Sequence, residues 1–144
     1  MRIAPPDAPP PPAALDGAVP GDQAAILRLA ATSFFEHLSQ MCEGILVVDR
    51  DANVVWISDR YERYLPSLGL RDPSEMIGRP VEQVVPNTLM RRIVETGQPI
   101  LLDIIDNAER SFVVSRFPLR NARGETIGAI GMILYDHIES LQPI

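Results

Sequence analysis

Apolar residues recur every three or four positions between residues 22 and 42, which is the spacing of one face of an α-helix. Asp22 can cap this helix, and Gly44 follows its end. The apolar positions form a seam of two heptads, Leu27, Ala31, Phe34, Leu38 and Met41. The seam packs either on the helix's own domain or on the same helix of a second subunit. In the second case a homodimer interface is formed by Leu27, Phe34, Leu38 and Met41.

From residue 44 onward the pattern changes to short β-branched runs of strand length. Two of them, "GILVVDR" and "NVVWIS", are joined at Asp51-Ala52 and predict a hairpin. Three more follow later in the chain: "ILLDIIDN", "SFVVSRFPL" and "TIGAIGMILYDH". The order predicts an α+β domain with one five-stranded antiparallel sheet, one face of which is covered by short helices.

The segment between the second and third runs is predicted to be helical in short pieces. A capping box at Asp59 and Glu62 starts the first piece. Continuous helix is excluded further on by four prolines, Pro66, Pro73, Pro80 and Pro86. A regular helix fits "NTLMRRIVETG", with Asn87 or Thr88 as its cap and Gly97 at its C-terminal end.

The two ends of the chain differ from this domain. Half of the fourteen prolines lie in the first twenty residues, and such a segment cannot build a core. We therefore predict four parts: a disordered proline-rich leader at 1–21, the flanking helix at 22–42, the domain at 43–137 and the first turns of an exit helix at 138–144.

The composition narrows the environment and the partners. A net charge of −6 argues against a broad basic surface for nucleic acid. No apolar stretch is long enough to span a membrane, and no secretory signal starts the chain, which favours the cytoplasm. A single cysteine, Cys42, excludes an internal disulfide.

Three stretches resemble a known family: "EGILVVDRDANVVWIS", "EMIGRPVEQVVPNTLMRRIVETGQPI" and "VSRFPLRNARGETIGAIGMILYD". Over residues 43–137 they resemble a PAS domain, and they are most similar to the sensory PAS modules of bacterial sigma-54-dependent transcriptional activators. That subfamily often has Asn before the arginine at 116, whereas this chain has Ser115. The resemblance implies the PAS fold and a sensor that controls an output domain, here transcription activation. A ligand-free dimerisation domain and a PAS module of a histidine kinase remain alternatives.

The sequence does not favour catalysis or a coloured cofactor. Neither His37 nor His137 accompanies a nucleophile motif, and no paired carboxylates have a spacing that suggests acid–base chemistry. The helix near residue 90 has no His or Cys to ligate haem. Residues 58–70 have no Cys to react with a flavin, and no His and Cys cluster suggests a metal. We predict a non-enzyme without haem, flavin or metal.

A cavity between the sheet and the helices is the predicted site. Strand alternation places Phe112, Val114 and Arg116 on one face, and Gly128 and Gly131 on the next strand remove side-chain bulk beside them. The predicted wall is Ile45, Val47, Trp56, Tyr64, Val85, Leu89, Ile93, Ile104, Val114, Ile130 and Met132. The predicted ligand contacts are Arg116, Ser115, Asn87, Tyr64, Trp56 and Met132.

Arg116 has two interpretations. It supplies a fixed positive charge for a carboxylate or phosphate ligand, or it has a structural role. In that role it pairs with an internal acid such as Glu62, Asp103 or Glu109, or it extends to the sheet edge with its stem on apolar neighbours. The other candidates also have structural alternatives: a helix cap for Asn87 and plain core for the aromatic side chains and Met132.

Overall fold

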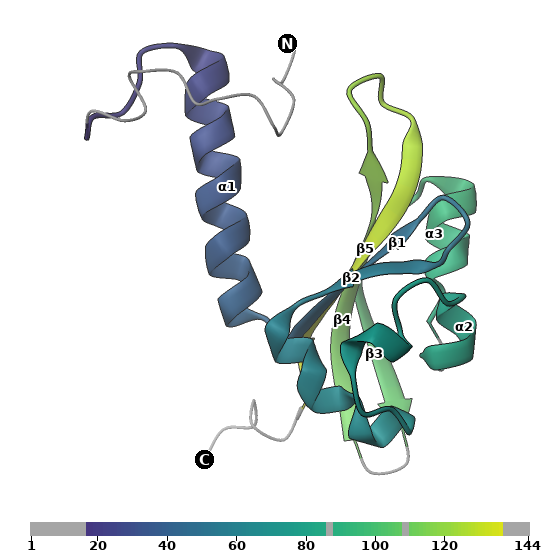
Figure 1. Cartoon of the computed structure of the whole chain (residues 1–144). Helices are drawn as coiled ribbons and strands as arrows, with labels where there is room; N and C mark the ends of the chain where they lie inside the picture. The colour runs from purple at the N-terminus through teal and green to yellow at the C-terminus, as the bar shows by residue number, and fades with distance from the viewer. Residues whose placement is uncertain (1–16, 86–87, 108–109, 137–144) are drawn as a thin grey trace. The chain divides into compact units, whose positions relative to one another are not determined.

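The computed structural model describes residues 17–85, 88–107 and 110–136 (Figure 1). The chain divides into two compact units, one ending at Leu38 and one starting at Ser39. Helix α1, Gln23–Met41, lies where the heptad seam predicts it and belongs largely to the first unit. No helix in the described ranges is both long and apolar enough to cross a membrane.

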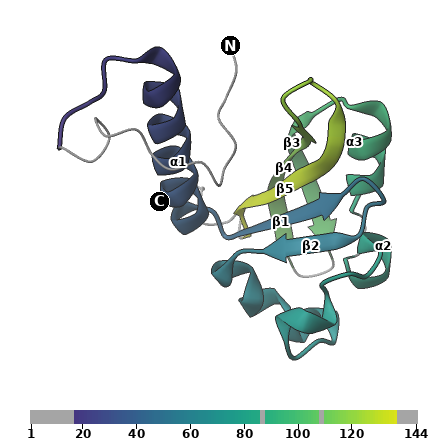
Figure 2. The same ribbon diagram turned by 45° about the horizontal axis from the view of Figure 1, so that its top comes forward.

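The second unit is built on a five-stranded antiparallel sheet in the order β2-β1-β5-β4-β3 (Figure 2). The strands are β1 Gly44–Asp49, β2 Val54–Ile57, β3 Ile100–Asn107, β4 Arg110–Arg120 and β5 Thr126–Tyr135. Each strand falls within one of the five apolar runs or overlaps it closely, so the predicted α+β sheet is confirmed.

The first and last strands are neighbours in this sheet. Gly44 at the start of β1 is opposite Ile133 near the end of β5. The backbone N–H of Glu43 donates to the carbonyl of Ile133 at 2.8 Å. The chain therefore enters and leaves the sheet at adjacent points.

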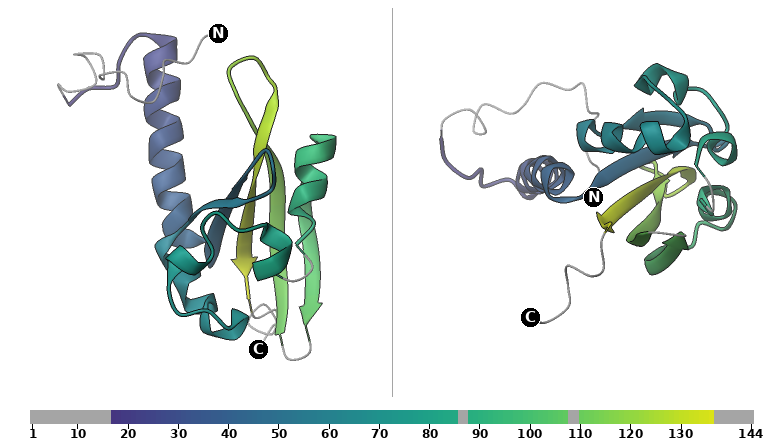
Figure 3. Two further views of the ribbon diagram at one scale, coloured as in Figure 1. Left: turned by 45° about the vertical axis from the view of Figure 1, so that its right-hand side comes forward. Right: turned by 90° about the horizontal axis from the view of Figure 1, so that it is seen from below.

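Short helices cover one face of the sheet (Figure 3). Helix α3 packs against β4 and β5, and the first 3-10 helix packs against β1. Their bounds are η2 Asp59–Tyr64, η3 Pro66–Leu68, η4 Pro73–Glu75, α2 Val81–Val84 and α3 Met90–Thr96. The predicted series of short pieces is confirmed, because Pro66 and Pro73 each begin a piece and Pro80 precedes one. Pro86 lies outside the described residues.

A well-packed core lies between this face and the helices. Its most deeply buried large side chains within the main cluster are Val48, Val54, Met76, Val81 and Ile93. Burial of these side chains supplies the main favourable free energy for docking the helices on the sheet.

The capping box forms at a different place from the one predicted. Helix η2 is preceded by Ser58, whose hydroxyl accepts the N–H of Ile45 at 2.9 Å and does not cap the helix. The observed box starts η4, where Asp72 accepts from Ser74 at 2.9 Å and Glu75 accepts from Asp72 at 3.1 Å. The capping box predicted at Asp59 does not form. Ser58, the residue before η2, uses its hydroxyl to accept the N–H of Ile45 in β1.

Helix α3 ends as predicted and begins differently. Gly97 ends it with a φ of 67°, in the left-handed region that favours glycine. At its start Leu89 occupies the capping position with a φ of 54° and no side-chain bond. Thr88 therefore is not the cap, and Asn87 lies outside the described residues.

Candidate functional site

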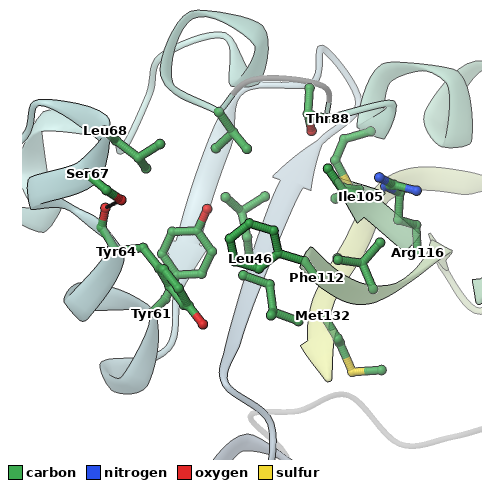
Figure 4. Close-up of a pocket in the computed structure, with 15 residues that line it drawn as sticks. Leu46, Tyr61, Tyr64, Ser67, Leu68, Thr88, Ile105, Phe112, Arg116 and Met132 are labelled. Carbon is green, nitrogen blue, oxygen red and sulfur yellow. Dashed lines mark hydrogen bonds between the residues drawn. The ribbon is translucent and has the colours of Figure 1, made fainter. Parts of the chain in front are cut away.

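A cavity of about 200 Å³ lies between the covered face of the sheet and the helices (Figure 4). Aliphatic and aromatic side chains make most of its wall, with a few polar groups among them. It is lined by Leu46, Tyr61, Tyr64, Ser67, Leu68, Val85, Thr88, Met90, Ile105, Phe112, Val114, Arg116, Gly131, Met132 and Ile133. A concave, largely apolar space with a few polar groups is the usual form of a small-molecule site.

The wall agrees with the prediction on β4 and differs on three other strands. Phe112, Val114 and Arg116 share the cavity face of β4, as predicted, and Tyr64, Val85 and Met132 also line the cavity. On β1 and β3 the lining residues are Leu46 and Ile105 in place of the predicted Ile45, Val47 and Ile104, and on β5 Gly131 replaces Ile130. These four predicted wall residues, Ile45, Val47, Ile104 and Ile130, do not line the cavity. Apolar residues occur at both odd and even positions of these strands, so the sequence does not show which set faces the cavity.

Arg116 is both paired and part of the cavity wall. It is 3% exposed, and its Nη1 donates to Oδ2 of Asp103 at 2.9 Å. The Arg116 guanidinium holds the pKa of the Asp103 carboxyl below its usual value. Asp103 is one of the three acids named from the sequence as an internal partner, so the pairing interpretation is realised without removing Arg116 from the cavity.

The two strand glycines have close neighbours, as predicted. Gly128 lies against the backbone carbonyl of Val48 in β1, where no Cβ would fit. Gly131 is opposite Arg116, and a Cβ there would lie 3.0 Å from Sδ of Met90. The first glycine lets β1 and β5 approach, and the second lets α3 approach the cavity wall.

Two tyrosines of η2 form the side of the cavity away from Arg116 (Figure 4). Both are 5% exposed, and their rings meet edge to face with centroids 5.5 Å apart. Burial raises the pKa of both hydroxyls. Gly44 makes room for this packing, because a Cβ there would lie 2.8 Å from Cδ2 of Tyr61.

The sequence reasoning missed Tyr61 as a wall residue. The signal was present in "DRYERY", where Tyr61 and Tyr64 are three residues apart. In a 3-10 helix residues at that spacing lie above one another, so both rings face the same way. Phe112 completes the aromatic group, with its ring centroid 6.1 Å from that of Tyr64.

Tyr64 also joins the cavity to both ends of the sheet domain. Its hydroxyl donates to Oδ2 of Asp136 at 3.0 Å and accepts from Nη2 of Arg63 at 3.1 Å. Arg63 in turn makes ion pairs with Asp136, at 3.6 Å, and with Glu43. Glu43 precedes β1 and Asp136 follows β5, so one polar cluster links a cavity side chain to the entry and the exit of the domain.

Three other predicted ligand contacts are placed differently. Ser115 is buried on β4 opposite Met132 but does not line the cavity. Trp56 on β2 is 40% exposed, is opposite Val47 and is not part of the lining. Asn87 lies outside the described residues. Ser115 lies next to Arg116 in β4, so the alternation that turns Arg116 toward the cavity turns Ser115 to the opposite face. Trp56 was misplaced because β2 is apolar at successive positions.

The predicted dimer seam on α1 is solvent-exposed in this single chain. Leu27 is 47%, Phe34 67% and Met41 75% exposed, and Leu38 is half-buried. The homodimer stays a prediction.

The cavity lining contains neither His nor Cys among the described residues. Cys42 is buried elsewhere, and burial raises the pKa of its thiol. No three metal-binding side chains gather in the described part of the chain. That the protein works without haem, flavin or metal stays a prediction.

Solved structures share this architecture. The VqmA dimer of Vibrio cholerae, a LuxR-type receptor, aligns with a TM-score of 0.55 and 20% identity over 81% of this chain and 54% of VqmA. VqmA bound to DPO aligns with a TM-score of 0.50 and 21% identity over 75% of this chain and 57% of that one. This chain thus spans little more than half the length of VqmA.

The PAS domain of the histidine kinase ThkA aligns with a TM-score of 0.51 and 21% identity, covering 62% of this chain and 94% of that domain. All three identities are low, so these likenesses concern the fold alone. No curated protein matches this sequence.

The family comparison is more direct. The model of the PAS fold family matches residues 38–136, well over half of the chain. That segment contains the whole described sheet, its covering helices and the cavity. The chain therefore belongs to the PAS fold family.

Proposed function

We propose that this chain is a sensory and regulatory module that binds a small molecule in its cavity and passes the occupancy of that cavity to an output domain. The observation that carries the proposal is the cavity itself, which combines an apolar wall with the buried side chains of Arg116 and Tyr61. A purely structural core would gain free energy by filling this space, since voids forfeit contacts. The module binds and does not catalyse.

The signal path runs through Tyr64. Its ring lines the cavity, and its hydroxyl is bonded to Asp136 and Arg63. A ligand that moves this ring changes the bonds at both ends of the domain. The ligand can shift the equilibrium between two positions of the ring only by the difference in its affinity for them.

Regulation of transcription is the proposed output. The hairpin in "SRFPLRNARGETIGAIG" supports it through the resemblance to sigma-54-dependent activators. VqmA, which shares the fold, is a DNA-binding receptor, and ThkA is a histidine kinase, so a kinase output is the alternative. The net charge of −6 supports an output domain, rather than this chain, as the part that contacts nucleic acid.

A thermal melt against a metabolite library tests ligand binding, because a compound specific to the folded state raises the Tm. The matched pair is Leu68→Trp, which adds bulk at the cavity, and Leu101→Trp, which makes the same change at a residue 64% exposed. We expect active compounds to raise the Tm of the wild type and of Leu101→Trp but not of Leu68→Trp. If no compound acts on the wild type, the proposal fails and a structural role replaces it.

Dimerisation is a second function that the structure favours. The observation is the exposed apolar seam of α1, with Phe34 67% and Met41 75% exposed. Large apolar side chains in a row on one helix are the usual material of a helix–helix interface.

A further inference from the structure

We infer that the cavity takes an uncharged molecule built on a single ring, with a hydrogen-bond acceptor facing Arg116 and a second polar group facing Tyr61. The inference rests on the proposed function and names the chemical class of the ligand.

The size of the cavity sets the size of the ligand. Its volume is about 200 Å³. An apolar cavity of about 150 Å³ in another protein accommodates one benzene molecule. The space here therefore fits one ring with a few substituent atoms. The rings of Tyr61, Tyr64 and Phe112 give such a ring aromatic faces and edges to pack against.

The charges around the cavity favour a neutral ligand. Arg116 is the charged residue of the described lining, and Asp103 already compensates it at 2.9 Å. A carboxylate or phosphate ligand, which the sequence left open, would bring an unbalanced negative charge into an apolar space. An ammonium ligand would face a guanidinium. Either charge is expensive to bury without its own counterion.

The guanidinium still has donors to offer. It carries five N–H groups, and Asp103 accepts from Nη1. No other partner of Arg116 is found among the described residues. A carbonyl oxygen or a ring nitrogen can accept from the remaining N–H groups without adding charge.

Tyr61 supplies the second polar contact. Its side chain lines the cavity, the residue is 5% exposed, and its hydroxyl has no hydrogen-bond partner in the described part of the chain. A hydroxyl that faces the cavity without a protein partner is free to form a hydrogen bond with a polar ligand atom. Tyr61 and Arg116 lie on different sides of the cavity (Figure 4), which places the two polar groups of the ligand on different sides of its ring.

The test uses one-ring probes of equal size and different charge. Benzamide, benzoate, benzylamine and toluene are titrated into the full chain at millimolar concentrations and followed by two-dimensional amide NMR. We expect benzamide to bind about tenfold more tightly than benzoate, benzylamine or toluene, since it alone is neutral and offers an acceptor. 4-Hydroxybenzamide, with a second polar group across the ring, should bind more tightly still.

Variants assign the two contacts. Tyr61→Phe keeps the ring and removes the hydroxyl, so it should abolish the advantage of 4-hydroxybenzamide over benzamide. Tyr135→Phe makes the same change at a residue 46% exposed and outside the lining, and should keep that advantage. Arg116→Met should remove the preference for benzamide over toluene. If Arg116→Met does not fold, the comparison of Tyr61→Phe with Tyr135→Phe still tests the contact with the second polar group of the ligand.

Each contrary outcome has its own meaning. Tightest binding of benzoate would make the cavity an anion site and overturn the inference. Equal binding of toluene and benzamide would overturn it as well, because no polar recognition would remain. If no probe binds while a library compound raises the Tm through the cavity, the ring class is wrong and the proposed function stands. If no library compound acts either, the proposed function itself fails.

Discussion

The buried guanidinium of Arg116 donates to the half-exposed carboxylate of Asp103 across the β3–β4 pair, at 2.9 Å. The two side chains are 4% and 37% exposed, so the pair is very unequal in burial. Asp103 is on β3, an edge strand of the sheet, where a β-bulge lies between Ile100 and Asp103. The buried guanidinium of Arg116 needs this counterion, whereas the more exposed carboxylate of Asp103 can be solvated by water.

Removing either partner should therefore have unequal effects. Asp103→Ala leaves a buried guanidinium without its counterion, whereas Arg116→Met leaves a carboxylate that water can solvate. We expect the larger decrease in the free energy of unfolding for Asp103→Ala, measured by urea denaturation. A larger loss for Arg116→Met would show that packing of the arginine stem matters more than its charge.

The same pair predicts a dependence of stability on pH. Arg116 lowers the folded-state pKa of Asp103 below its unfolded value of about 3.9. Its contribution is therefore complete above that unfolded value and is lost as the pH falls through the folded-state pKa. We expect the stability difference between wild type and Asp103→Asn to shrink as the pH falls below about 4. A difference that stays constant in acid would contradict the ion pair.

The two glycines of β5 predict graded effects on packing. Gly128→Ala pushes a methyl group onto the Val48 carbonyl, and the backbone of β1 cannot yield cheaply. We expect it to lower the free energy of unfolding by about 1–3 kcal/mol. Gly131→Ala meets the flexible thioether of Met90 at 3.0 Å, so its loss should be smaller. The opposite order in thermal and urea unfolding would contradict this packing.

Tyr64→Phe separates binding from signalling. It keeps the ring in the cavity and removes the bonds to Asp136 and Arg63, at a loss of about 1 kcal/mol in stability. A library compound should still raise the Tm, but hydrogen exchange at Glu43 and near the end of β5 should no longer respond to it. Tyr135→Phe is the control and should respond as wild type does.

The seam on α1 predicts the oligomeric state. Leu27→Glu with Phe34→Glu places charges in the proposed interface. Light scattering should show monomers for this double variant and dimers for the wild type. Thr32→Glu with Ser33→Glu adds the same charge at exposed positions of the helix outside the seam and should leave the dimer intact. Equal masses for all three proteins would show that the seam is not the dimer interface.

The sequence predicted the order of elements better than the faces they use. The cavity face of β4 was predicted correctly, because Phe112, Val114 and Arg116 follow one another at every second position and all three line the cavity. In "GILVVD" no polar residue separates the two faces, and Ile45 was chosen where Leu46 lines the cavity. Hydrophobic periodicity does not show which face of a strand is inward when its residues are apolar at successive positions.

Local motifs were ambiguous for a related reason. Asp59 and Glu62 have the spacing of a capping box, as do Asp72 and Glu75, but the box forms at the second pair. The choice depends on Ser58, whose hydroxyl bonds to the backbone of Ile45 in β1. That contact joins residues distant in sequence, and only the folded chain brings them together.

The hydrogen bond from the backbone N–H of Glu43 to the carbonyl of Ile133 ties the start of β1 to the end of β5. Because β1 and β5 run in opposite directions side by side, any sliding of one along the other alters the distance between the incoming and outgoing chain at once. Neither β3 nor β4 has to move for this to happen. The two ends of the sheet domain are therefore held one inter-strand spacing apart by the β1–β5 pairing.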